Sequence, residues 1–183
     1  METFPTVSPE QLSDSDLLRG RDQAADQMRW MRHYTRQLID SIPLQLWYQR
    51  PSGAQTHVAW QVGHLAVSQY GLMLFRQRGR APGDLDLMPG WLRKQFGRGS
   101  VPAESAAGQP TPEELLAKLE AIDLQAQAEL PSFTAESLRQ PIDMPYAAYP
   151  IQLGALVFCP MHEALHAGQI GLLRRLHDLE PLR

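Results

Sequence analysis

Apolar side chains recur at steps of three and four residues in four long segments of this chain, which is the period of an amphipathic helix. The first segment covers residues 15–42 and stops before Pro43. Its inward positions are Leu17, Ala24, Met28, Met31, Leu38 and Ile42. Because proline lacks a backbone donor and clashes with the preceding turn, the pattern predicts a helix that ends at this point.

The second segment, residues 56–78, is apolar around most of its circumference, as expected of a helix buried between others. Thr56 is the predicted N-cap, and Gly79 follows the last helical residue. At 100° per residue, the side that carries His64 also carries four other residues. They are His57, Trp60, Gly71 and Phe75.

The third segment has the clearest start signal. Thr111 is the predicted N-cap, Pro112 suits the first helical position, and Glu114 completes a capping box. The inner stripe is Leu115, Leu119, Ile122 and Ala126, and Pro131 ends the helix.

The fourth segment covers residues 151–179. Pro160 lies inside it, and predicts either a kinked helix or a fresh helix that starts at this proline.

Two long connections, residues 79–110 and 131–150, separate these segments, and neither shows the alternation of a strand. The first contains a predicted short helix over residues 90–96. Loops this long are uncommon in compact domains unless they cover a site or an interface. We expect them to shape the entrance of a site, with Trp91, Tyr146 or Tyr149 near it. We therefore predict an all-α fold, a four-helix bundle with long crossover loops, in which residues 1–183 form a single domain.

Composition narrows the classes of partner. The formal net charge of −3 gives no overall attraction to nucleic acid or to anionic membranes. No apolar run reaches the roughly 18 residues of a membrane span, and the first residues lack the pattern of a signal peptide. Cys159 is the only cysteine, which excludes an intrachain disulfide. We expect a cytoplasmic protein with no nucleic-acid or membrane partner.

The candidate chemistry is a metal site. His162 and His166 are four residues apart on the last predicted helix, so their imidazoles lie one above the other and can share one divalent ion. A lone histidine on an apolar face, such as His64, is more often a hydrogen-bonded core residue than a ligand. Metal sites in bundles, however, are built from inward side chains on facing helices. We predict His64 as the third ligand.

Neighbouring residues have two interpretations each. Glu163, about 100° round the helix from His162, is expected to act as a base on a metal-bound water or to orient a ligand, with a solvated or interhelical glutamate as the alternative. Gln169 either donates to a ligand or, more in keeping with its position, holds a neighbouring helix. His57 is interpreted as a partly exposed residue near the helix start, with the mouth of the site as the alternative. Cys159 is either a buried structural cysteine or a group that approaches the metal.

The literal pattern His-Glu-x-x-His also occurs in zinc proteases. One such class has a glycine three residues, and a histidine six residues, after the second histidine, where this chain has Gln169 and Leu172. Another class takes a downstream glutamate as its third ligand, and Glu180 is the only glutamate after His166. No strand is predicted that would bind a peptide by edge pairing. The protease interpretation therefore fails.

Two motifs together resemble a known family. Trp60-x-x-Gly63-His64-Leu65 followed by His162-Glu163-x-x-His166-x-Gly168-Gln169-Ile170-x-x-Leu173-Arg174-Arg175 resembles the DinB-like superfamily of bacterial four-helix bundle proteins. The resemblance covers nearly the whole chain in helix order and spacing. It implies a metal triad at His64, His162 and His166, and a homodimer formed through the bundle surface. Relatives include S-transferases and isomerases that use low-molecular-weight thiols.

Three imidazoles leave coordination positions open on a divalent ion for water, substrate or a thiolate. We expect one ion per chain, zinc or nickel, with iron and manganese as alternatives. The resulting functional hypothesis is a metal-dependent hydrolase or a thiol-dependent transferase that acts on a small molecule. The alternative is a non-catalytic module for metal binding or dimerisation.

Overall fold

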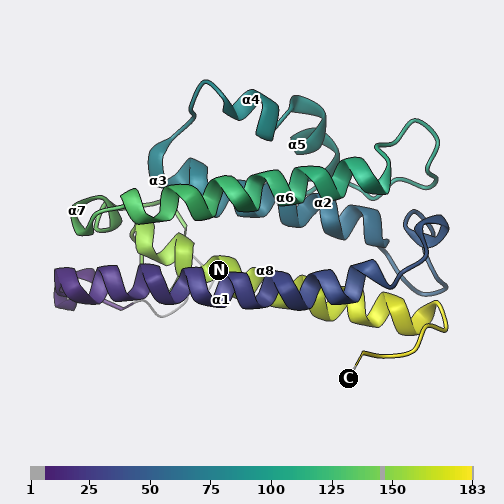
Figure 1. Cartoon of the computed structure of the whole chain (residues 1–183), viewed down its shortest axis with the longest axis horizontal. Coiled ribbons are helices and arrows are strands. Elements are labelled where there is room, and N and C mark those ends of the chain that lie inside the picture. The colour runs from purple at the N-terminus through teal and green to yellow at the C-terminus, as the bar shows by residue number, and fades with distance from the viewer. Residues whose placement is uncertain (1–6, 145–146, 183) are drawn as a thin grey trace.

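The computed structural model describes residues 7–144 and 147–182, and within them it forms an all-α bundle (Figure 1). Four long helical segments make the bundle. They are α1 (Asp14–Asp40), α2 (Val58–Gln69) with its continuations η3 (Tyr70–Phe75) and α3 (Arg76–Arg78), α6 (Pro112–Glu129), and α8 (Gln152–Leu176). In these residues the only bridge of the kind found in sheets is an isolated one between Pro141 and Ile151. The predicted fold class is confirmed.

Short helices occupy the two long connections. The first holds α4 (Asp84–Leu87) and α5 (Gly90–Phe96), and the second holds η4 (Leu130–Ser132) and α7 (Ala135–Leu138). Two further short turns are η1 (Pro9–Gln11) and η2 (Leu44–Leu46). The predicted helix over residues 90–96 is confirmed. Both connections are thus partly helical.

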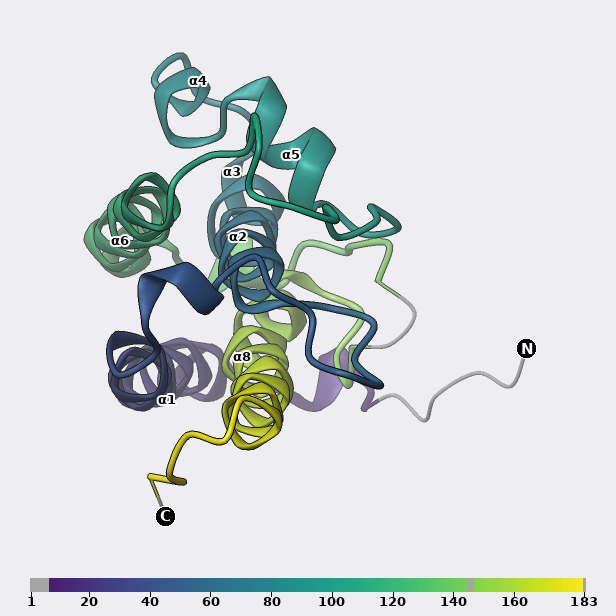
Figure 2. The same ribbon diagram turned by 90° about the vertical axis from the view of Figure 1, so that its right-hand side faces the viewer.

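The four long segments form two packed pairs around one core (Figure 2). α1 packs against α8, α2 packs against α6, and α2 also contacts α8. α5 packs on α2, and α4 contacts α6, so these two short helices lie outside the bundle. In the described residues, no helix has both the length and the apolar character needed to cross a membrane.

Helix starts follow the local sequence signals closely. The capping box of α6 is present as predicted: Thr111 Oγ1 accepts from the Glu114 backbone, and the Glu114 side chain accepts from the Thr111 backbone. The stripe predicted to face inward on this helix is buried. The predicted N-cap of α2 is wrong. His57 caps this helix, since its Nδ1 accepts from the Trp60 backbone N–H, while the Thr56 hydroxyl accepts from the Gln61 side chain.

Helix α8 runs through Pro160 without a break. The interpretation of a fresh helix that starts at this proline is therefore wrong. The proline is buried, as are most of the residues around it on the inward face. His162 and His166 lie after the proline, near the middle of this one continuous helix.

A π-helical stretch, η3, interrupts the second segment and changes which side chains share a face with His64. In a regular α-helix, Arg76 would lie about 120° from His64 around the axis, and Phe75 about 20° from it. A π turn absorbs roughly one extra residue, which brings Arg76 to about 20° instead. The Arg76 backbone N–H accordingly bonds to the carbonyl of Gly71. The expectation that Phe75 shares the side of His64 is wrong, because this ring is turned outward and is 50 % exposed.

A buried polar network connects the four long segments. Arg32 of α1 is 8 % exposed and binds Glu163 of α8, which is 2 % exposed, through two hydrogen bonds of 2.8 and 2.7 Å. The same guanidinium donates to the side chain of Gln69 on α2 (2.9 Å) and to a backbone carbonyl of α6 (3.3 Å). Gln69 in turn donates to Asp123 of α6. Arg32, which is itself on α1, thus bonds to the other three long segments of the bundle.

Glu163→Gln removes the carboxylate that makes both charged hydrogen bonds to the buried Arg32 and leaves only Asp123, 4.0 Å away, as its counter-charge, so the free energy of unfolding should fall by about 3–5 kcal/mol. Urea denaturation of the metal-free protein measures this loss. The matched control is the double variant Arg32→Met with Glu163→Met, which removes both charges from the core and should recover most of the stability. A Glu163→Gln protein as stable as the wild type would contradict the structural role of the pair.

Candidate metal centre

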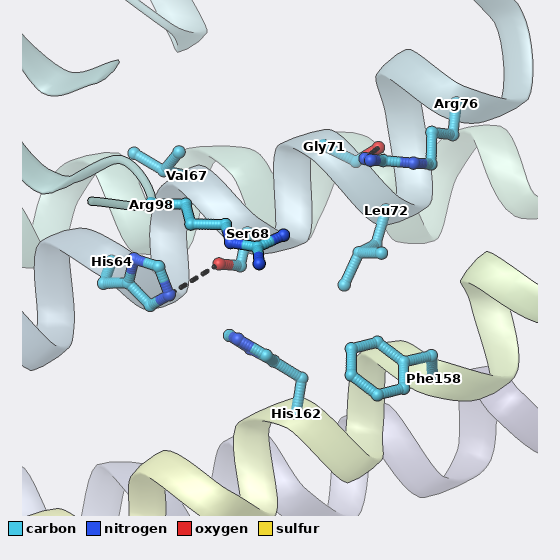
Figure 3. Close-up of a pocket in the computed structure, with 9 residues that line it drawn as sticks. All are labelled: His64, Val67, Ser68, Gly71, Leu72, Arg76, Arg98, Phe158 and His162. Atoms are coloured by element: carbon cyan, nitrogen blue, oxygen red, sulfur yellow. Dashed lines mark hydrogen bonds between the residues drawn. The ribbon is translucent and has the colours of Figure 1, made fainter. Parts of the chain in front are cut away.

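Three histidines from two helices meet between α2 and α8. A nitrogen atom of His64, one of His162 and one of His166 all lie within 4.8 Å of one another. The ring centroids are 4.5 Å apart for the pair on α8, and His64 lies 5.3 Å from His162 and 4.8 Å from His166. Figure 3 shows the ring of His162 on α8 reaching toward that of His64 on α2. The structure therefore brings together the three residues predicted as ligands.

The orientation of His64 is fixed by a backbone carbonyl. Its Nδ1 is 2.7 Å from the carbonyl oxygen of Phe96 at the end of α5. Because a carbonyl oxygen only accepts, Nδ1 carries the proton and the lone pair of Nε2 remains available to a metal. The ring of Trp60 stacks on this imidazole, with centroids 4.7 Å apart and planes 7° from parallel.

Gly63 explains how Phe96 comes so close to α2. A Cβ atom added at this glycine would lie 2.4 Å from the ring of Phe96, far inside van der Waals contact. The absence of a side chain at Gly63 lets the Phe96 ring pack directly on the helix. The glycine before His64 thus allows the close approach of Phe96, whose carbonyl oxygen forms the hydrogen bond that orients His64.

His166 is held in the same manner by a side chain. Its Nδ1 is 2.5 Å from Oε1 of Gln61, so Nδ1–H donates and Nε2 is again left for a metal. The amide of Gln61 donates to Oε1 of Gln169 (2.8 Å) and to the hydroxyl of Thr56 (3.1 Å). Gln169 therefore connects α8 to α2, and its interpretation as a residue that holds a neighbouring helix is confirmed.

Burial keeps the three imidazoles neutral. It lowers the pKa of His162 to about 4 and that of His166 to about 3, with a smaller contribution from the neighbouring imidazoles. Burial also lowers the pKa of His64, against the hydrogen bond to Phe96. Neutral imidazole is the form that binds a metal, so all three ligands are ready at neutral pH without losing a proton.

These three residues fit a divalent ion. Zinc is usually tetrahedral and lies about 2.0–2.1 Å from an imidazole nitrogen, so the nitrogens around one ion are about 3.4 Å apart. From separations of up to 4.8 Å, the ring nitrogens need to close by no more than about 1.5 Å to reach that geometry. A ring nitrogen held by a carbonyl or amide, as in His64 and His166, is the usual outer contact of a metal-bound histidine.

The neighbours of the triad have other partners. Both carboxylate oxygens of Glu163 bond to Arg32, and this residue is not in the cluster of ligand atoms. Cys159 is buried and also outside that cluster, and burial followed by the charge of Glu163 raises the pKa of its thiol. The structure thus agrees with the interpretation of Cys159 as a buried structural cysteine.

His57 has a structural position. It caps α2 through Nδ1, as expected of a residue near the helix start, but it is fully buried rather than partly exposed. Its Nε2 lies 3.1 Å from the carbonyl oxygen of Ala103, to which it donates. His57 therefore ties the connection after α5 to the start of α2.

A cavity of about 490 Å³ opens beside the triad, between α2 with η3 and α8. Two of the three histidines line it, together with polar, basic and apolar side chains (Figure 3). The lining is His64, Val67, Ser68, Gly71, Leu72, Arg76, Arg98, Phe158 and His162. The residues expected near the entrance were Trp91, Tyr146 and Tyr149. Trp91 and Tyr149 pack on the core instead, and Tyr146 lies outside the described residues.

The long first connection does reach the site, but through Arg98 rather than Trp91. No pattern in the sequence pointed to Arg98, since an exposed arginine in a loop belongs to no periodic face. Gln61 was also missed, although a glutamine within an apolar helical run is a signal of a buried hydrogen bond. The carbonyl of Phe96 is a backbone group, and only the glycine at position 63 pointed to a close approach of two elements.

The comparison with protein families agrees with this geometry. The model of the DinB superfamily matches residues 27–170, a range that includes all three histidines. The chain belongs to the DinB superfamily. The match also covers the residues that hold the triad, from Arg32 to Gln169. No curated protein was found to be similar to this member of the DinB superfamily.

We expect the purified protein to carry about one divalent ion per chain, bound by the three histidines. The variants His64→Ala, His162→Ala and His166→Ala should each lose most of the metal, as measured by elemental analysis. His33→Ala is the matched control, because His33 is exposed on α1. Metal content at the wild-type level in His64→Ala would exclude this residue as a ligand.

Proposed function

We propose that this protein is a metal-dependent enzyme that acts on a small molecule in the cavity beside the triad. One observation carries the proposal: His64 and His162 belong to the ligand cluster and also line the cavity. A ligand in that cavity therefore has access to the ion. An ion that only held the helices together would need no such opening.

A divalent ion held by three neutral imidazoles lowers the pKa of a bound water or thiol, and so supplies a nucleophile near neutral pH. Zinc and nickel suit imidazole ligands best, and iron and manganese are the alternatives. His64 and His166 are held in the correct tautomer by Phe96 and Gln61, which prepares the site before a ligand enters.

Of the two reaction classes, we favour thiol-dependent transfer over hydrolysis. Hydrolysis is helped by a free base that takes a proton from water, and the carboxylate of Glu163 is engaged by Arg32. A thiol loses its proton much more readily than water, so it depends less on such a base. The hydroxyl of Ser68, which also lines the cavity, lies 3.3 Å from Nε2 of His64.

The alternative is a non-catalytic module in which the ion only connects α2 to α8. That interpretation needs a closed coordination shell. A fourth ligand from α8 would be Glu163 or Cys159, the acid and the thiol close to His162 in the sequence, and neither is in the cluster. Three ligands with an adjoining cavity favour the enzyme.

An exchangeable coordination position is the testable difference between the two. In protein substituted with cobalt, azide or mercaptoethanol should bind the ion directly and change the visible spectrum in a saturable manner. The same ligands added to His162→Ala after the same cobalt treatment provide the control, since loss of a histidine ligand should leave little bound cobalt and no saturable spectral change. A wild-type spectrum that does not respond would contradict the enzyme and favour the module.

We also propose that a second copy of this chain covers an apolar patch on α1 and α8. The patch consists of Trp30, Met161 and Leu165, which are 58 %, 58 % and 64 % exposed. A shallow cavity of about 270 Å³, lined almost entirely by apolar side chains, lies between Trp30 and Met161. Contiguous exposed apolar surface of this kind is typical of protein interfaces, and relatives in this family form homodimers.

A charge in the middle of this patch should weaken the dimer. We expect the wild type to sediment as a dimer and Trp30→Glu to sediment as a monomer at the same concentration. Leu85→Glu is the matched control, because Leu85 is equally exposed but lies on α4. A monomeric wild type would refute the proposal.

A further inference from the structure

The cavity beside the triad continues into a second one. This second cavity has a volume of about 470 Å³ and shares Val67, Gly71 and Arg76 with the first. It lies between η3 and the connection that holds α4 and α5. Its other lining residues are Tyr70, Phe75, Arg80, Met88, Gly90 and Arg93. The two cavities together form one groove, with Arg76 at the junction.

The groove is lined by four arginines and by no acidic residue. Arg98 lines the first cavity, Arg80 and Arg93 line the second, and Arg76 lines both. Asp84 accepts a hydrogen bond from Tyr70 at the second cavity, but this carboxylate is already paired with Arg78. The charge that lines the groove is therefore positive along its whole length.

These four side chains differ from most other arginines of the protein. Eight arginines elsewhere form ion pairs with aspartate or glutamate: Arg19, Arg21, Arg29, Arg32, Arg36, Arg50, Arg78 and Arg139. None of the four groove arginines forms an ion pair with a carboxylate of the described residues. Arg76 donates one hydrogen bond, to the carbonyl of Gly71, and keeps its other donors.

Local structure places two of these arginines beside the triad. The π-helical stretch η3 turns Arg76 onto the side of α2 that carries His64. Arg98 follows α5, the helix whose last residue bonds to His64. Arg98 and Ser68 line the same cavity, and in the view of Figure 3 the guanidinium group projects next to Ser68.

Like charges held close together repel one another, and a bound anion relieves that repulsion. Guanidinium groups also match the geometry of a carboxylate or phosphate, to which they donate two parallel hydrogen bonds. We propose that this groove selects small molecules that carry a negatively charged group on the end remote from the metal. The arginines act as specificity determinants: Arg76 and Arg98 for shorter ligands, and Arg80 and Arg93 in addition for longer ones.

This inference rests on the proposed function, because it assumes that one end of the ligand binds the ion.

Two thiols of equal length test the anion proposal separately from the proposed function. They are mercaptohexanoate, which ends in a carboxylate, and mercaptohexanol, which ends in a hydroxyl. The six-carbon chain is too long to close a stable chelate ring on the ion. Titration of each thiol into the cobalt-substituted protein, followed in the visible spectrum, gives the two affinities.

In the wild type we expect the acid to bind roughly five- to tenfold more tightly than the alcohol, and high salt to reduce this ratio. Arg76→Gln and Arg98→Gln should lower the ratio toward one while the alcohol binds as before. The unchanged affinity for the alcohol shows that each variant is folded and loaded. Arg175→Gln is the matched control, since Arg175 is exposed on α8 and lines neither cavity.

The outcomes are distinct. If neither thiol changes the spectrum, the proposed function fails. If both bind equally tightly to the wild type, or if Arg76→Gln and Arg98→Gln leave the ratio unchanged, the anion proposal is overturned and the proposed function stands. The second cavity is tested with the eleven-carbon acid mercaptoundecanoate. Its preference over the matching alcohol should fall in the double variant Arg80→Gln with Arg93→Gln, and an unchanged preference would overturn the extension into that cavity.

Discussion

The buried ion pair of Arg32 and Glu163 is the interaction on which the metal centre depends. It fixes α8 against α1, and the same guanidinium group bonds to α2 and α6. Glu163 lies on the helix turn between the two histidines of α8, and Gln69 follows His64 by five residues on α2. A shift of α8 along α2 would therefore break this network and separate the three histidines together. Charges buried at such cost are retained where they define one arrangement of the helices.

The triad is held by groups that have no charge of their own. The carbonyl of Phe96 and the amide oxygen of Gln61 each accept a hydrogen bond from one imidazole, so the other nitrogen of each ring is left for a metal. Burial lowers the pKa values of the three rings and keeps protons from competing with a metal. The protein thus builds a neutral set of ligands next to an interior that carries a fully compensated charge pair. The cationic side chains lie further out, along the groove.

Much of this arrangement could be predicted from the chain alone. Periodic apolar positions and capping signals gave the four segments, because they depend on neighbours within one or two helical turns. The histidine pair on α8 was visible for the same reason. The partner of Glu163 was not, since Arg32 is far away in the sequence and bonds only after the helices have packed. The π-helical stretch was also hidden, because Tyr70–Phe75 has the composition of an ordinary helix. That single irregularity exchanged Phe75 for Arg76 on the face of the site.

The π-helical stretch also has an evolutionary consequence. It is equivalent to one residue inserted into a helix, placed after His64 and Gln69 and before Arg76. Substitutions that wind this stretch as a regular α-helix of unchanged length would leave the histidine and the polar network in place, and would return an aromatic ring to the face that now holds a guanidinium group. Within this helical segment only the short α3 follows the stretch. A lineage could in this manner exchange a preference for anions for a preference for apolar molecules by a change in helix winding, with its metal ligands untouched.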